Sequence, residues 1–131
     1  NVRDWLYVDD HVEAIKLVMA SGKIGGTYAV GGGAALENIV LLDALCRAVA
    51  AETGKPADDY RSLITYVKDR PGHDRRYAID STKIRSELGW EPRVGVEEGL
   101  HLTVRWYLGN PEWVNGVKSG EYRNWLKLQY S

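Results

Sequence analysis

The first 33 residues alternate between two hydrophobic periods, and this alternation constrains the fold more than any other feature of the chain. Residues 2–8 are rich in β-branched and aromatic side chains, which predicts a strand. A predicted helix follows, with Asp10 and Glu13 forming an Asp-x-x-Glu capping pattern at its start and Gly22 ending it. Residues 27–30 predict a second short strand. A strand, a helix and a strand with short connections make one α/β unit, which is too small to be a complete parallel sheet.

The chain beyond Gly33 predicts a mostly helical lobe with short strands, so we place a domain boundary there, between residues 1–33 and 34–131. Helical spacing begins near Glu37 or Asn38 and ends at Gly54. Further helices are expected over 81–88, where Asp80 is the predicted cap, over 96–108, and once or twice within 111–130. Residues 64–67 and 76–79 are the strand candidates of this lobe.

Composition excludes several classes of protein. Lys and Arg number 17 against 18 Asp and Glu, and this balance argues against a general nucleic-acid or membrane-surface binder. The single cysteine, Cys46, excludes an internal disulfide framework and a multi-cysteine metal site, and its place on an apolar helix face predicts packing. We find no apolar run of about 20 residues and no leader pattern, so a cytoplasmic location is the expectation.

The segment from Lys68 to Arg76 is the sharpest candidate for chemistry, because four cations and His73 lie in nine residues around a Pro-Gly bend. Arginine binds phosphate oxygens in a bidentate manner, so such a loop suits a diphosphate. The alternative is a solvated loop whose arginines pair with Asp69 and Asp74, and composition alone favours it. Residues 31–33, three glycines, could likewise cradle a phosphate, although a flexible turn is the simpler interpretation because the G-x-G-x-x-G spacing is absent.

Other polar residues have simple structural interpretations. A lone Arg3 is typically a surface ion pair, and Asn38 at a helix start is most simply a cap. His11 is a poor catalytic candidate, and His101 is expected to face solvent. The histidines lie too far apart for a local metal motif, and the chain has no nucleophile elbow, Walker loop, H-E-x-x-H or paired-carboxylate signature. The residues therefore predict no metal site and no complete catalytic constellation.

Several runs nevertheless resemble one family of nucleotide-sugar-modifying extended short-chain dehydrogenases, the dTDP-glucose 4,6-dehydratases. The resemblance spans essentially the whole chain and is most specific in residues 70–80 and in the Trp-rich tail. The runs are VRDWLYVDDH (2–11), RPGHDRRYAID (70–80), ELGWEP (87–92), WYL (106–108), WVN (113–115) and KSGEY (118–122).

The resemblance implies an enzyme that converts dTDP-glucose to dTDP-4-keto-6-deoxyglucose with NAD as a recycled hydride carrier, commonly for dTDP-rhamnose biosynthesis. The family's glycine-rich NAD fingerprint, its Tyr-x-x-x-Lys pair and its dehydration residues match nothing here. We therefore expect the carboxy-terminal third of such an enzyme, inactive alone and a partner of the amino-terminal part. The implied fold class is α/β, with residues 1–33 ending a Rossmann-like parallel sheet and 34–131 forming a sugar-nucleotide-binding lobe. The complete protein is expected to be a cytoplasmic homodimer.

Matching motifs carry over only substrate-binding roles, to Arg3, Asn38, Arg70, His73 and Tyr130. Arg3, Arg70 and His73 match residues that hold the nucleotide diphosphate, Asn38 matches a nucleotide ligand, and Tyr130 matches a tyrosine that closes over the site. By resemblance, diphosphate binding becomes the favoured interpretation of the charged loop. No catalytic or cofactor-binding residue carries over.

Other functions stay open at this point. The chain could be part of an extended dehydrogenase acting on a UDP-sugar, such as an epimerase or decarboxylase, and a preference for UDP over dTDP would indicate this. It could also be a free-standing sugar-nucleotide-binding module. A nucleic-acid-binding basic loop predicts strongly salt-dependent oligonucleotide binding.

Overall fold

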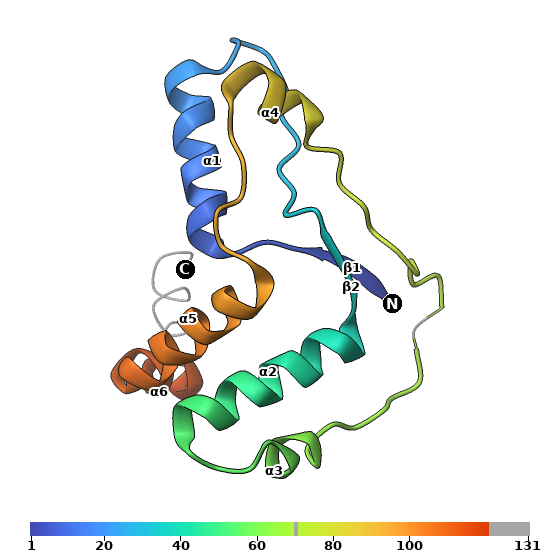
Figure 1. Cartoon of the computed structure of the whole chain (residues 1–131), viewed down its shortest axis with the longest axis vertical. Helices are drawn as coiled ribbons and strands as arrows, with labels where there is room; N and C mark the ends of the chain where they lie inside the picture. Colours follow the sequence, from blue (N-terminus) through green and yellow to red (C-terminus); the bar gives the residue numbers. More distant parts are fainter. Residues whose placement is uncertain (70, 121–131) are drawn as a thin grey trace, which may run out of the picture.

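The computed structural model describes residues 1–69 and 71–120 of the 131-residue chain. It is a mixed α/β structure in which helices dominate, as the sequence predicted. Figure 1 shows α1 beside α4 at one end, and α2, α3 and α5 at the other, with the two strands between them. In chain order the elements are β1 (Val2–Trp5), α1 (Val8–Ser21), β2 (Ala34–Glu37), α2 (Asn38–Thr53), α3 (Ala57–Arg61), α4 (Thr82–Leu88), α5 (Val96–Gly109) and α6 (Pro111–Ser119).

Strand β1 has neighbours on both sides and organises the middle of the molecule. It pairs antiparallel with β2, in a register that places Val2 opposite Glu37 and Trp5 opposite Ala34. On its other edge, the Val2 N–H donates to the Arg75 carbonyl at 2.7 Å, and the Val2 carbonyl accepts from the Tyr77 N–H at 3.1 Å. Three segments far apart in sequence therefore lie side by side at β1.

The glycines at 31–33 allow the chain to pass close to β1. A Cβ at Gly32 would lie 2.0 Å from the Trp5 carbonyl oxygen, and one at Gly31 would lie 2.5 Å from Oδ2 of Asp4. Gly33 adopts φ +70°, which side-chain-bearing residues rarely reach. Close packing, and neither a phosphate cradle nor mere flexibility, explains why these positions are glycine.

Helix α1 packs one face on the best-buried core of the molecule. That core consists of Ala14, Ile84 and Trp90, each at most 5% exposed. Partly buried apolar side chains surround it, namely Leu6, Leu17, Val18, Tyr28, Val30 and Leu88. The opposite face of α1 carries the exposed side chains Val8, Val12, Ile15 and Met19. The helical spacing of Val12, Ile15, Val18 and Met19 predicts these four as the inward face, but of them only Val18 packs against the core.

Asp10 is not part of a capping box, and this prediction was wrong. Helix α1 begins at Val8, its N-cap is Tyr7, and no side chain caps it. Asp10 lies in the first turn, two residues after Val8, and is 6% exposed. Its Oδ2 accepts hydrogen bonds from the backbone N–H groups of Arg93, at 3.0 Å, and Val94, at 2.9 Å. The carboxylate thus ties α1 to the segment that leads into α5.

Several predicted strands are absent from the described residues. The strand predicted over 2–8 ends at Trp5, where β2 stops pairing with it. Residues 27–30 and 64–67 form no strand, and 76–79 contributes only a single parallel bridge between Val2 and Arg76. A strand needs a hydrogen-bonded neighbour, and the described residues supply none for 27–30 and 64–67. The observed partner of β1 is the unpredicted β2.

The predicted helices beyond Gly33 are confirmed within one or two residues. Asp80 is not the N-cap of α4 as predicted, because Ser81 holds that position and no side chain caps the helix; Oδ1 of Asp80 accepts the Thr82 N–H at 2.9 Å in the turn before it. Gly54 and Gly89 end α2 and α4 in left-handed conformations, with φ of 72° and 68°. Cys46 is buried, in agreement with a packing role. The described residues include the short helix α3, which was not predicted, and the part of the tail beyond residue 120 lies outside them.

Helices α2 and α5 are joined by charged side chains as well as by apolar contacts. Oε1 of Glu52 accepts from Nδ1 of His101 at 3.0 Å and from Nε of Arg105 at 2.9 Å. These two donors lower the pKa of Glu52. His101 is therefore engaged with α2 and does not simply face solvent as predicted. No helix in the described ranges is long and apolar enough to cross a membrane.

Candidate functional site

A group of polar side chains gathers where the charged loop meets the amino end of β1. We call this group the polar cluster; it consists of Arg3, Asp69, His73, Asp74 and Tyr77. Arg3 comes from β1, and the other four come from the loop between α3 and α4. The backbone hydrogen bonds of Val2 to residues 75 and 77 hold that loop against the strand. The loop is thus anchored at β1, while its described residues from 68 to 80 are exposed except for the half-buried His73.

Arg3 has its guanidinium fixed from several directions. Nη2 lies 2.8 Å from Nε2 of His73 and donates to the Asp74 carbonyl at 3.0 Å. Nη1 donates to the Val2 carbonyl at 2.7 Å. The guanidinium carbon lies 4.3 Å from the centre of the Tyr77 ring, within cation–π range. Arg3 is therefore oriented before any ligand arrives.

His73 and Tyr77 are held in turn by the acidic residues of the loop. Nδ1 of His73 lies 2.6 Å from Oδ1 of Asp69. The Tyr77 hydroxyl donates to Oδ2 of Asp74 at 2.5 Å. Sequence reasoning assigned both acids to possible arginine pairs and gave Tyr77 no role. The four-residue spacing from Asp69 to His73 was the available signal, but it becomes informative only once the loop is bent.

Asn38 lies on the other side of β1, as the first residue of α2. Its N–H donates to the Asn1 carbonyl at 2.9 Å, next to the β1–β2 pairing. It is not the helix cap, because Glu37 holds that position and no side chain caps α2. The Oδ1 atom of Asn38 is buried and finds no hydrogen-bond partner among the described residues. Buried amide oxygens normally have a partner, so this acceptor is unsatisfied within the described part of the chain.

The structure brings two of the five predicted site residues, Arg3 and His73, into direct contact. Asn38 is connected to this end of β1 through its backbone hydrogen bond to Asn1. Arg70 and Tyr130 lie outside the described residues. Substrate binding by all five stays a prediction.

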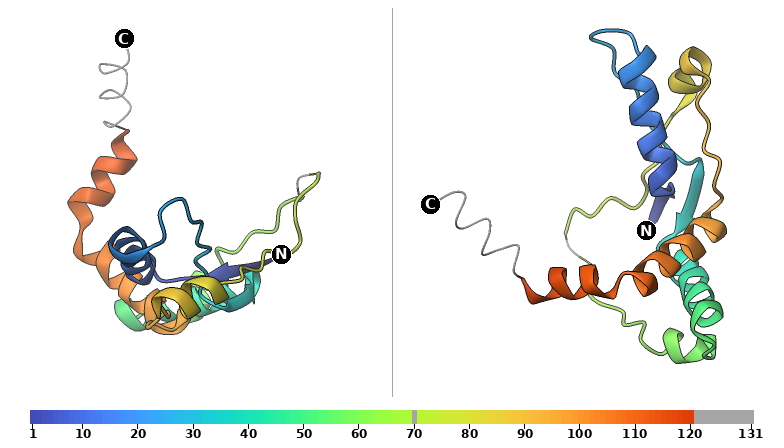
Figure 2. Two further views of the ribbon diagram at one scale, coloured as in Figure 1. Left: turned by 90° about the horizontal axis from the view of Figure 1, so that it is seen from above. Right: turned by 90° about the vertical axis from the view of Figure 1, so that its left-hand side faces the viewer.

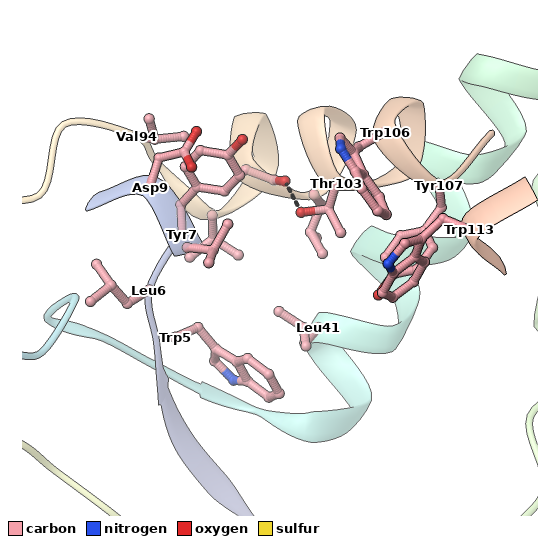
Figure 3. Close-up of a pocket in the computed structure, with 14 residues that line it drawn as sticks. Trp5, Leu6, Tyr7, Asp9, Leu41, Val94, Thr103, Trp106, Tyr107 and Trp113 are labelled. Atoms are coloured by element: carbon pink, nitrogen blue, oxygen red, sulfur yellow. Dashed lines mark hydrogen bonds between the residues drawn. The ribbon is translucent and has the colours of Figure 1, made fainter. Parts of the chain in front are cut away.

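An apolar pocket of about 600 Å³ lies at the opposite, carboxyl end of β1 (Figure 3). Its labelled walls come from the end of β1, from α2, and from α5 and α6. Trp106, Tyr107 and Trp113 form an edge-to-face group with ring centres 5.0 to 5.9 Å apart. Each of these rings is about half exposed, so they form a rim rather than a closed core. Figure 2 shows α6, which carries Trp113, projecting from the layer of the other helices.

Tyr7 is the titratable side chain of this pocket whose environment is most altered. Burial raises its pKa, and the neighbouring Asp9 carboxylate raises it further by charge repulsion and by accepting a hydrogen bond. Tyr7 therefore stays a neutral phenol at physiological pH. It contributes a flat, mostly apolar wall with a single hydroxyl.

The described residues do not fit a dinucleotide or a metal ion. In a dinucleotide fold, glycines let a phosphate approach the backbone, but here the approach at Gly32 is already filled by the Trp5 carbonyl. Within 1–69 and 71–120, no three His, Cys, Asp or Glu side chains are placed to hold a metal.

The class of protein follows from a comparison with known families. A family model described as GDP-mannose 4,6 dehydratase matches residues 1–103. The chain therefore belongs to this family of nucleotide-sugar dehydratases.

Within that class, the relatives narrow the assignment. The chain is 50% identical to the dTDP-glucose 4,6-dehydratase of Salmonella typhimurium over 129 residues, which is 98% of this chain and 36% of that protein. It is 53% identical to the enzyme of the same name from Xanthomonas campestris over 126 residues, which is 93% of this chain and 35% of that protein. The chain thus spans about a third of the length of these relatives. The resemblance to dTDP-glucose 4,6-dehydratases is confirmed.

Solved structures also show similarity to dTDP-glucose 4,6-dehydratases. A dTDP-glucose 4,6-dehydratase from Streptomyces venezuelae, with NAD and TYD bound, matches at a TM-score of 0.73 and 42% identity, covering 86% of this chain and 33% of that one. The enzyme from Bacillus anthracis, in complex with NAD, matches at a TM-score of 0.69 with the same identity and coverage. These neighbours are Rossmann-type short-chain dehydrogenases, which confirms the predicted fold class. The boundary near Gly33 stays a prediction.

Proposed function

We propose that this chain is the carboxy-terminal, substrate-binding part of a dTDP-glucose 4,6-dehydratase. The complete enzyme would convert dTDP-glucose to dTDP-4-keto-6-deoxyglucose with NAD as a recycled hydride carrier. Identity of about half of all residues to enzymes of that name supports the assignment. A cytoplasmic location and a homodimeric state for the complete enzyme are predictions from the resemblance alone.

The meeting of Arg3 and His73 at β1, with Asn38 beside them, carries the proposal. A guanidinium has five N–H groups, and the contacts of Arg3 with Val2, His73 and Asp74 use three of them. Two N–H groups thus remain without a partner in the described part of the chain. A diphosphate offers several acceptor oxygens, and a held guanidinium binds such oxygens by charge-assisted hydrogen bonds.

Asn38 fits a different portion of the same ligand. Its unpaired buried Oδ1 is an acceptor, and a diphosphate has no hydrogen to donate to it. A thymidine nucleotide can donate hydrogens to it, from its sugar hydroxyls and from its ring N–H. We therefore assign Arg3 to the diphosphate, with His73 holding its guanidinium, and Asn38 to the nucleoside side of dTDP.

The remaining chemistry would come from elsewhere in the complete protein. NAD supplies hydride transfer when it is bound, and we assign its binding to the amino-terminal part of the same protein. The residues of this chain bind the nucleotide and orient the sugar attached to it. The chain alone is expected to give no turnover.

Substitution of Arg3 in the native protein that contains this chain tests the proposal. Arg3→Gln removes a charge-assisted contact on the order of 1.5–3 kcal/mol, which corresponds to about a 10- to 100-fold weaker Kd for dTDP-glucose. The measurement is calorimetric titration, with formation of the 4-keto product followed in parallel. A clear preference for UDP-glucose over dTDP-glucose would contradict the proposed substrate.

Arg47→Gln is the matched control for this experiment. Arg47 is likewise an arginine held by hydrogen bonds, here to the carboxylates of Asp43 and Glu97, but it lies on α2 away from the polar cluster. Its loss should leave the Kd within twofold. Equal losses for the two variants would indicate a general charge effect and would remove Arg3 from the site. Turnover of dTDP-glucose by the 131-residue chain alone would contradict the proposal that this chain only binds the substrate and that the amino-terminal part is needed for catalysis.

A further inference from the structure

We propose that Asp69 is a positioning residue for the diphosphate site, acting through His73 on Arg3. The inference rests on the proposed function, because it explains how the arginine assigned to the diphosphate is held. Neither the resemblance nor the comparisons assign Asp69 a role.

The three side chains form a continuous chain of contacts. Oδ1 of Asp69 lies 2.6 Å from Nδ1 of His73. The other ring nitrogen, Nε2, lies 2.8 Å from Nη2 of Arg3. The imidazole is thus the link between a carboxylate on one side and a guanidinium on the other, and its side chain is 23% exposed.

The donors and acceptors around His73 determine which nitrogen of its imidazole carries the hydrogen. An arginine has N–H donors and no acceptor, so the contact with Arg3 is a hydrogen bond only if Nε2 of His73 carries the lone pair. A neutral imidazole then has its hydrogen on Nδ1, where it donates to the Asp69 carboxylate. An imidazolium, or the opposite tautomer, would point an N–H of His73 at an N–H of Arg3.

The remaining neighbours are compatible with this assignment. Nδ2 of Asn1 lies 3.1 Å from Nδ1 of His73 and 3.5 Å from Oδ2 of Asp69. A hydrogen donated by Asn1 to the carboxylate leaves the His73 Nδ1–H bond to Oδ1 intact. Asp74, the nearest other acid of the loop, accepts from the Tyr77 hydroxyl through its Oδ2 and receives Arg3 through its backbone carbonyl.

Asp69 therefore acts on the ligand indirectly: it contacts His73, His73 contacts Arg3, and Arg3 binds the diphosphate. By accepting from Nδ1, it keeps Nε2 free to accept from Arg3. Without that acceptor, the Nε2–H tautomer becomes available, and it would replace an attraction to Arg3 by a repulsion. Arg3 would lose one of its three hydrogen bonds, and its guanidinium would bind a diphosphate less well.

The tautomer of His73 is measured directly by long-range ¹H–¹⁵N NMR of the imidazole in the native protein, at pH 7.5 and without nucleotide. We expect wild type to show a protonated Nδ1 and an unprotonated Nε2. Asp69→Ala should shift the signals toward the Nε2–H tautomer and weaken the Kd for dTDP about 5- to 20-fold. Asp69→Asn keeps a neutral acceptor for Nδ1, so it should keep the tautomer and most of the affinity.

Asp74→Asn is the control for charge alone. It removes the same charge from the same loop without touching the imidazole, and Asn can still accept from Tyr77, so the His73 signals should not change tautomer. An Nε2–H or imidazolium form in wild type would overturn the proposal. So would an unchanged tautomer in Asp69→Ala, or a shifted tautomer with unchanged dTDP affinity. Failure of wild type to bind dTDP would instead overturn the proposed function, while the ligand-free tautomer still decides the role of Asp69.

Discussion

The two ends of β1 are built in opposite ways. Its amino end carries Arg3 and joins the polar cluster, where side chains are held by directed hydrogen bonds to the loop. Its carboxyl end leads through Leu6 to the buried core under α1 and through Tyr7 to the apolar pocket. The first end orients donors near the surface, and the second buries apolar area. We infer that stability depends on the carboxyl end and ligand recognition on the amino end.

The largest effect on stability is expected in the core at the carboxyl end. Ile84 is fully buried against Ala14 and Trp90. Ile84→Ala leaves a cavity and should lower the free energy of unfolding of the 131-residue chain by about 2–5 kcal/mol. Urea unfolding measures this. The affinity of the folded native protein for dTDP should change less than twofold, and a larger change would mean that the two ends of β1 are not separable.

The next effect concerns Asp10, the buried acid that joins α1 to the segment before α5. Asp10→Ala leaves two backbone N–H groups, of Arg93 and Val94, without their acceptor and should cost about 1–3 kcal/mol. Asp9→Ala removes the neighbouring carboxylate, which is exposed, and should cost clearly less. Thermal unfolding of both variants measures the difference. Equal losses would indicate that the helix dipole, and not the tie to residues 93–94, explains the effect.

The smallest effect on stability is expected at the amino end, where the effect on binding is the larger one. Tyr77 is 46% exposed and lies under the Arg3 guanidinium. Tyr77→Leu removes a cation–π contact of about 0.5–1 kcal/mol, so the dTDP affinity of the native protein should fall about two- to fivefold. The unfolding midpoint should stay close to that of wild type. If Tyr77→Leu lowered the stability without lowering the dTDP affinity, the amino end of β1 would serve stability and not ligand recognition.

The two ends also differ in what their sequence reveals. Helix ends were predictable because stop signals act locally, as Gly54 and Gly89 show for α2 and α4. Residues 27–30 looked like a strand, but strand formation depends on a neighbour that the pattern does not contain. Asp10 looked like a cap because its spacing from Glu13 is right, whereas its partners lie more than 80 residues away.

The polar cluster was predictable only in part, because some of its contacts depend on how the chain folds and not on local sequence. The motif resemblance pointed to Arg3 and His73, and the fold brings them to 2.8 Å. Nothing in the local sequence indicated that Asp69 contacts His73 rather than an arginine, because that contact depends on the bend of the loop. Close packing at Gly31 and Gly32 was also hidden, since the spacing of glycines does not show which backbone they face.

The central claim is that the amino end of β1 recognises a diphosphate through Arg3. The most direct measurement compares the affinities of dTDP and thymidine for the native protein and its Arg3→Gln variant by calorimetric titration. The account predicts a loss of about 10- to 100-fold for dTDP and less than twofold for thymidine, which lacks phosphate. An equal loss for both ligands, or no loss for dTDP, would contradict it.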